Sequence, residues 1–166
     1  MTVVLVLLLA LLIGVVAGLR ALTPPAVVAW AGAIGWINLD GTWAAWMTHP
    51  ITLTVLTILL LVELVTDQLP STPSRKVTSQ FSARLLTGAF AAAVLVTGAI
   101  FQVKTGTIVS GIGAGIVGAV LGTLGGAEAR SRLVAKIGGR DLPVALAEDL
   151  VAVLGGFAVA ASASLL

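Results

Sequence analysis

Residues 51–70 read ITLTVLTILLLVELVTDQLP, an apolar run that carries two acidic side chains, Glu63 and Asp67, and ends at Pro70. A helix needs about 20 mostly apolar residues to cross the hydrocarbon core of a bilayer. A charged side chain near the centre of such a helix costs about 2.5–3.5 kcal/mol on insertion scales, so it is usually retained for a function. The stretch therefore predicts a membrane-spanning helix over 51–69 with two candidate functional residues.

The composition of the whole chain is that of a membrane protein. Hydrophobic residues make up 58% of the 166 residues and charged residues only 10%, whereas about a quarter of the residues in a soluble domain are charged. No polar block is long enough to form a separate soluble domain, so we expect one integral membrane domain over residues 1–166. The chain has no cysteine, which excludes disulfides and thiolate chemistry.

Apolar stretches at 3–19, 85–101, 106–126 and 143–165 predict four further membrane-spanning helices. No basic residue precedes the first stretch and Arg20 follows it, which favours a retained helix over a signal peptide. The fold class is therefore all-α, a polytopic transmembrane bundle of five to six helices. We expect no nucleic-acid partner, because the basic residues lie in loops between apolar helices, where membrane orientation explains them.

The sixth helix depends on residues 22–39, which are uncharged but only weakly apolar. The stretch begins with Thr23-Pro24-Pro25, and we expect Thr23 to be the N-cap and Pro24 the first helical residue. Gly32 and Gly35 interrupt the second half of the stretch. The segment is compatible with a short span, a re-entrant helix or an interfacial helix.

The basic residues predict how the chain is oriented. Seven of the nine lie in loops 70–84 and 126–142, which the positive-inside rule places on the cytoplasmic side of a bacterial inner membrane. If 22–39 spans the membrane, Arg20 joins that side and both termini lie outside; we favour this arrangement. The seven residues are Arg75, Lys76, Arg84, Arg130, Arg132, Lys136 and Arg140.

This orientation brings four acidic residues to one depth near the cytoplasmic face: Glu63, Asp67, Glu148 and Asp149. Arg84 and, if 22–39 spans the membrane, Arg20 are predicted at the same level, and the candidate charge partners are Arg20, Arg84 and Arg130. One interpretation is a set of structural ion pairs; the other is a site for an ion, a proton or a small solute. We expect a small transporter or channel component in which Glu63 and Glu148 bind the ion and Asp67, Asp149 and Arg20 balance the charge. The alternative is a non-transporting scaffold or accessory subunit.

Small residues recur at helical spacing in three of the predicted helices. Such seams allow helix backbones to approach closely, either within the bundle or between subunits, so we expect packing seams and self-association. They comprise Gly14 and Gly18, then Gly111, Gly115, Gly118, Gly122 and Gly126, and finally Ala145, Asp149, Ala152, Gly156 and Ala160.

Residues 128–140 predict a short cytoplasmic helix with a charged face. Glu128 and Arg132 are four residues apart and form a favourable pair. Arg132, Lys136 and Arg140 continue the stripe and suit anionic lipid headgroups. The single histidine, His49, makes no metal site alone, and no base is spaced to activate a serine. We therefore expect neither enzyme activity nor a metal or cofactor.

Three short motifs resemble those of a family of small, multi-spanning bacterial membrane proteins grouped as a domain of unknown function. The first is Gly18-Leu19-Arg20, followed by Pro24-Pro25. The second is the Glu-x-x-x-Asp-x-x-Pro element at Glu63, Asp67 and Pro70, and the third is Glu148-Asp149. The resemblance implies a polytopic inner-membrane protein and supplies neither an activity nor a substrate.

Overall fold

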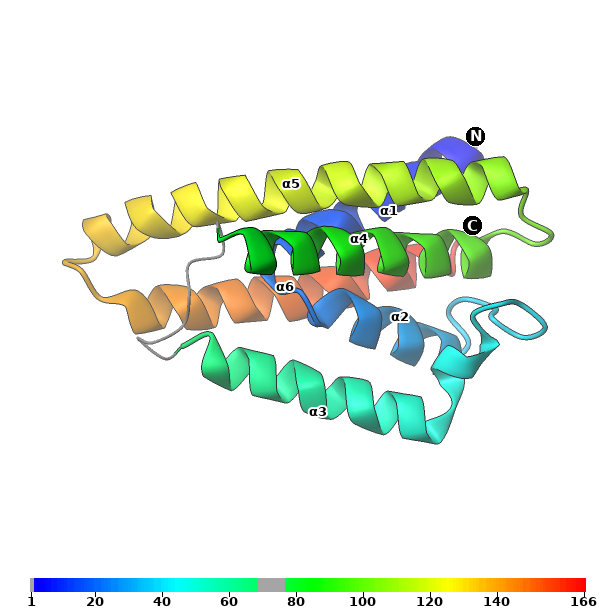
Figure 1. The fold of residues 1–166 in the computed structure, drawn as a ribbon, viewed down its shortest axis with the longest axis horizontal. Helices are drawn as coiled ribbons and strands as arrows, with labels where there is room; N and C mark the ends of the chain where they lie inside the picture. Colours follow the sequence, from blue (N-terminus) through cyan, green and yellow to red (C-terminus); the bar gives the residue numbers. More distant parts are fainter. Residues whose placement is uncertain (1, 69–76) are drawn as a thin grey trace.

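The computed structural model describes residues 2–68 and 77–166, which form six α-helices and one 3-10 helix (Figure 1). No β-strand occurs in these two segments. The predicted all-α bundle is therefore confirmed. The elements are α1 (Thr2–Leu19), α2 (Thr23–Ala33), η1 (Ala45–Thr48), α3 (Pro50–Thr66), α4 (Thr78–Ala99), α5 (Thr105–Lys136) and α6 (Asp141–Ala163).

Three of the helices, α4, α5 and α6, are long and apolar enough to cross a membrane. Two more, α1 and α3, are apolar but shorter; the 17 residues of α3 extend about 26 Å. These lengths and compositions indicate a membrane protein. The loop expected between the helices at 51–69 and 85–101 falls partly on residues 69–76, which lie outside the described residues. Pro70, Arg75 and Lys76 belong to this part.

The predicted separate helix over 128–140 is wrong. α5 continues without a break from the apolar stretch through Glu128 to Lys136. The chain turns only at Gly138 and Gly139, whose φ angles of 74° and 81° fall in the left-handed region that glycine tolerates best. Arg140 therefore lies outside α5 and is the N-cap residue of α6.

Residues 22–39 form a half-length helix followed by irregular chain. α2 has 11 residues, which extend about 16 Å, roughly half the thickness of the hydrocarbon core. It turns back beside α1 and leads to the loop at the end of the bundle where both termini lie (Figure 1). The predicted cap is wrong: Leu22 is the N-cap residue and Thr23 lies inside the helix, without a side-chain cap. A carboxylate from α3 binds the backbone N–H groups just before the helix.

The tightest packing joins α1 to α5, which run side by side (Figure 1). A Cβ added at Gly118 of α5 would collide with the backbone of Leu11 and Val15, and one at Gly14 of α1 with the backbone of Gly115. Glycine is required here because the two backbones touch. The predicted glycine seam is thus a contact inside the bundle.

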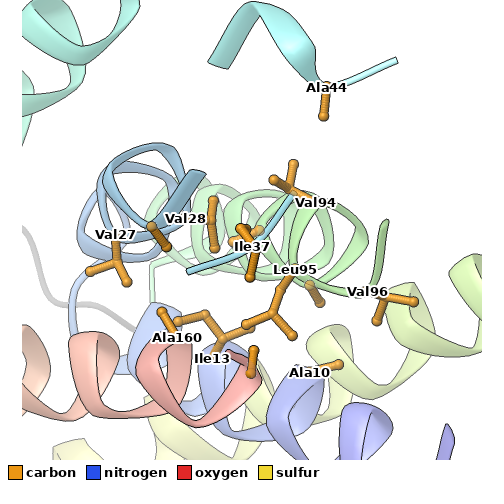
Figure 2. Close-up of a cluster of buried hydrophobic side chains, with 14 of the residues drawn as sticks. Ala10, Ile13, Val27, Val28, Ile37, Ala44, Val94, Leu95, Val96 and Ala160 are labelled. Atoms are coloured by element: carbon orange, nitrogen blue, oxygen red, sulfur yellow. The ribbon is translucent and has the colours of Figure 1, made fainter. Parts of the chain in front are cut away.

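The apolar core lies in the half of the bundle near the termini. Ile13 of α1, Val27 of α2, Leu95 of α4 and Ala160 of α6 converge there, and Ile37 packs onto them from the loop after α2 (Figure 2). α6 contributes Ala160 and Ala163 to this core, and its predicted small-residue face, from Ala145 to Ala160, is buried along the helix. The buried charged residues Arg20, Glu63, Arg84 and Asp149 lie in the other half.

α3 lies at the edge of the bundle (Figure 1). It packs mainly against α2 and η1. Glu63 is the only residue of α3 that is buried, and the apolar side chains along the rest of the helix are half-buried or exposed. The one side chain of α3 that enters the protein fully is therefore a carboxyl group.

Candidate functional site

A buried arginine occupies the break between α1 and α2. The Arg20 side chain has no exposed surface. Its Nη1 donates to Oδ2 of Asp67, just after α3, at 2.5 Å, and its Nε donates to Oδ1 of Asp149 in α6. One guanidinium group thus ties the end of α1 to two other helices. A charge so far from water requires such partners, because an unpaired buried charge is strongly unfavourable.

Glu63 binds the start of α2. Its Oε1 accepts a hydrogen bond from the backbone N–H of Ala21 at 2.6 Å, and its Oε2 accepts one from the N–H of Leu22 at 2.8 Å. Amide groups at a helix N-terminus lack partners within the helix and carry a partial positive charge. The carboxylate of Glu63 accepts hydrogen bonds from the two N–H groups that lead into α2 and brings a negative charge to this end of the helix.

Arg84 of α4 binds the other side of the same break. Its Nη1 donates to the carbonyl oxygens of Gly18, at 2.9 Å, and Leu19, at 2.7 Å. These carbonyls end α1, where the helix dipole is negative. Nη2 of Arg84 lies 3.7 Å from Oδ2 of Asp67. An arginine therefore caps the end of α1 and a glutamate caps the start of α2, each with the charge that the dipole favours.

These five residues form one site, which we call the Arg20 cluster: Arg20, Glu63, Asp67, Arg84 and Asp149. Two guanidinium groups face three carboxylates within it. Gln68 donates from Nε2 to Oδ2 of Asp149 at 3.1 Å. The side chains of Asp67 and Asp149 keep 15% and 11% of their surface exposed, so the two aspartates link the buried guanidinium to the edge of the protein.

Some polar atoms in this half of the bundle have no hydrogen-bond partner among the described residues. They are Nη2 of Arg20 and the hydroxyl oxygens of Thr23 and Thr123, all buried. Buried polar groups in proteins are normally hydrogen-bonded to the protein or to ordered water. The interior near the α1–α2 break therefore has capacity for additional hydrogen bonds.

Glu148 belongs to a different group of charges. Its Oε2 lies 3.3 Å from Nη1 of Arg130, and Arg130 also pairs with Asp141, with an Nη2–Oδ2 distance of 2.6 Å. We call Arg130, Asp141 and Glu148 the Arg130 cluster; it joins the end of α5 to the start of α6. The structure thus brings three of the four predicted acids together around Arg20 and places the fourth with Arg130.

The remaining charged candidates lie on the surface. Arg132 pairs with Glu128 at 2.7 Å on α5, with both side chains largely exposed. Lys136 ends α5 and Arg140 precedes α6, and both are exposed. His49 is exposed and caps α3, since its Nδ1 accepts a hydrogen bond from the N–H of Ile51. No group of His, Asp and Glu suited to hold a metal occurs among the described residues.

Sequence reasoning missed several parts of both clusters. The backbone groups that Glu63 and Arg84 bind carry no sequence signal beyond Pro24 and Pro25, which only indicate that a new helix begins. Gln68 follows Asp67 directly and gave no signal of its own. Asp141 was detectable, because it faces Arg130 across the Gly138–Gly139 turn.

Residues 7–165 match the sequence model of a family described as a domain of unknown function, DUF4126. The chain belongs to this family. The resemblance inferred from the three short motifs is thereby confirmed at the level of the family. No curated protein and no solved structure matches the chain. The family description assigns no activity, so the function must be argued from the site.

Proposed function

We propose that this protein is a small membrane transporter or channel component whose Arg20 cluster binds an ion, a proton or a small polar solute. The observation that carries the proposal is the fully buried Arg20 at the α1–α2 break, shared by carboxylates from two other helices. Ionisable groups inside a membrane protein are costly and commonly mark ion or proton pathways.

The break itself supports the same function. Binding sites of secondary transporters are often built from discontinuous helices, whose exposed ends bind charged groups. Here the end of α1 and the start of α2 meet in such an arrangement, and Arg84 and Glu63 bind the two ends. The similarity of this break to such sites supports the proposal, with the chain's own side chains bound to the two helix ends.

Asp67 and Asp149 are the best candidates for the groups that bind and release the transported proton or ion. Both bind Arg20 through single hydrogen bonds and reach the edge of the protein. Glu63 is held by two backbone amides, and Glu148 pairs with Arg130. A proton or a cation that binds Asp67 weakens its attraction to Arg20 and so loosens α3, which has few other buried contacts.

The second candidate function is a non-transporting scaffold or accessory subunit. It is favoured by the observation that each acid of the Arg20 cluster already has a protein partner, either an arginine or a pair of backbone amides. On this account the cluster serves only to stabilise the break between α1 and α2.

We further propose that the charged end of the bundle faces the cytoplasm of a bacterial cell, as the basic loops predict. Arg132, Lys136 and Arg140 then meet anionic lipid headgroups beyond the apolar part of α5. Self-association would use a face other than the α1–α5 seam, because that seam is filled within the bundle.

Flux measurements in proteoliposomes test the transport proposal. We expect the wild-type protein to carry protons or small monovalent ions, followed with an internal pH dye and with ion-selective electrodes. Asp67→Asn and Asp149→Asn should each reduce this flux by about tenfold or more, as removal of a proton- or charge-accepting group does. Glu128→Gln is the matched control, because its carboxylate is exposed and pairs only with Arg132.

Thermal unfolding of the same purified variants separates the two functions. Retained folding with lost flux supports transport and contradicts the scaffold. Absence of flux from the wild-type protein for every ion tested, combined with unfolding of both aspartate variants, contradicts transport and supports the scaffold.

A further inference from the structure

A cavity of about 560 Å³ lies at the opposite end of the protein from the Arg20 cluster. The loop between α2 and η1 lines one side, and the end of α4 with the α4–α5 connection lines the other. These segments lie at the same end of the bundle (Figure 1). Pockets that bind small molecules commonly have volumes of about 300–1,000 Å³. The cavity is therefore large enough for a small organic group, and it is independent of the function proposed above.

The two walls are fixed to each other by hydrogen bonds and close packing. The backbone N–H of Asn38 donates to the carbonyl of Gly98 at 2.8 Å, and Nε1 of Trp43 donates to Oγ1 of Thr97 at 3.0 Å. Leu39 also packs so closely on Gly98 that a Cβ there would lie 2.8 Å from its Cδ2. A cavity with walls held in this way is preformed, which lowers the entropic cost of binding.

A single carboxylate gives the cavity its charge. Asp40 lines it and is the one acidic side chain at this end of the bundle; the other six belong to or lie near the Arg20 and Arg130 clusters. The backbone N–H of Asp40 donates to Oδ1 of Asn38. Its carboxylate forms no hydrogen bond or ion pair with the part of the chain that the structure describes. An exposed carboxylate without a protein partner attracts a cation.

Aromatic rings complete the lining. Trp43 is 49% exposed and Phe101 is 88% exposed, so each offers ring surface to a ligand. Trp43 is also held in place by an edge-to-face contact with Phe90, with ring centroids 6.0 Å apart. Next to Phe101, Gln102 has a φ of 51°, the only positive φ at a non-glycine residue in the described segments. Such backbone conformations are uncommon and cluster at binding sites.

We propose that this cavity binds an alkylammonium group. A cavity lined by an acidic residue and aromatic residues suits ammonium ligands, because the ring faces and the carboxylate both attract the cation. The ammonium group belongs either to the headgroup of a zwitterionic lipid or to a free ammonium compound such as choline. Both sources share the same chemistry, and the position of the cavity at the end of the bundle is accessible to both.

Isothermal titration with choline tests this proposal, using the full-length protein in a maltoside detergent free of amine headgroups. We expect saturable binding of choline and no binding of 3,3-dimethylbutan-1-ol, its neutral isostere. Asp40→Asn should weaken binding by about tenfold or more, and Phe101→Ala by about threefold or more, the range expected for loss of cation–π contacts. Trp46→Phe is the control, because Trp46 is also an exposed tryptophan but does not line the cavity.

A second measurement distinguishes the source of the ammonium group. Native mass spectrometry counts phosphatidylethanolamine or phosphatidylcholine retained by the wild-type protein and by Asp40→Asn, with phosphatidylglycerol as the reference lipid. Retention of the amine lipids that is lost in Asp40→Asn supports the lipid source even if free choline does not bind. The proposal is overturned if neither choline nor an amine lipid binds, if the neutral isostere binds equally, or if correctly folded Asp40→Asn binds as the wild type does.

Discussion

α1 and α3 are both apolar helices of nearly equal length, yet they are held in the protein by different means. α1 packs against α5, α4 and α6, and its backbone touches the backbone of α5 through glycines. α3 packs mainly on α2 and η1, and its one buried side chain is the carboxyl of Glu63. Close packing holds α1, whereas charged groups and hydrogen bonds hold the C-terminal end of α3.

The difference indicates which helix can move. Close packing through glycine has one favourable arrangement, because any displacement loses many contacts at once. Charged hydrogen bonds can be exchanged for others when a proton or an ion binds. We therefore infer that α1 and α5 form the fixed part of the protein, and that α3 responds to the state of the Arg20 cluster.

The largest effect is expected at the α1–α5 seam. Gly118→Leu places a side chain against the backbone of Leu11 and Val15, where no side chain can move aside. We expect the variant to fail to fold, or to lose more than the about 1–3 kcal/mol typical of overpacked cores. Unfolding in mixed detergent micelles measures the change. Gly125→Ala on the same helix is the control: no atom lies within 4 Å of its added Cβ, so it should be neutral or stabilising.

The next largest effect is expected at the Arg20 cluster. Arg20→Met removes the guanidinium and leaves Asp67 and Asp149 without their shared partner. Breaking a buried ion pair in this way costs about 3–5 kcal/mol, which the same unfolding titration would detect. The triple variant Arg20→Met, Asp67→Asn, Asp149→Asn should recover part of the loss. A triple variant less stable than Arg20→Met would contradict the pairing.

The smallest effect is expected on the surface of α5. Arg132→Gln breaks the pair with Glu128, in which the two side chains are 74% and 57% exposed. Pairs of this kind contribute about 0.3–0.5 kcal/mol within a helix, so the free energy of unfolding should change by no more than that. The binding of this charged surface to vesicles with anionic lipids should weaken as salt is added. The free energy of unfolding should change less over the same range of salt. A loss of stability comparable to that of Arg20→Met would show that burial of the charges does not determine how much an ion pair contributes to stability.

Much of the fold could be predicted from the sequence, because apolar length and small-residue spacing act locally. The stretches at 85–101, 106–126 and 143–165 correspond to α4, α5 and α6, and Gly118 and Gly14 occupy the packing seam as expected. The predictions that were wrong concern a local structure that depends on a residue distant in the sequence. Thr23 has a good cap sequence, yet α2 is capped at Leu22, whose N–H binds Glu63 from far along the chain in another helix.

The site could be predicted only in part, for the same reason. The expected helix directions already placed Glu63, Asp67 and Asp149 at one level of the bundle, and the structure brings these three residues together. Their partners did not follow from the sequence, because adjacent residues on a helix point in different directions: Asp149 reaches Arg20, while Glu148 reaches Arg130. Nor does composition show that α5 continues past its apolar part to Lys136, since only the glycines at 138 and 139 end it.

The central claim is that the charges of the Arg20 cluster hold α3 while α1 stays fixed. The chain has no cysteine, so spin labels can be placed at exposed sites and their separation measured by double electron–electron resonance in nanodiscs. One pair at Ile58 and Val117 reports on α3, and a second at Leu8 and Leu124 reports on α1 relative to α5. Glu63→Gln should add a longer distance for the first pair and leave the second unchanged. Unchanged distances for both pairs, or equal changes in both, would contradict the account.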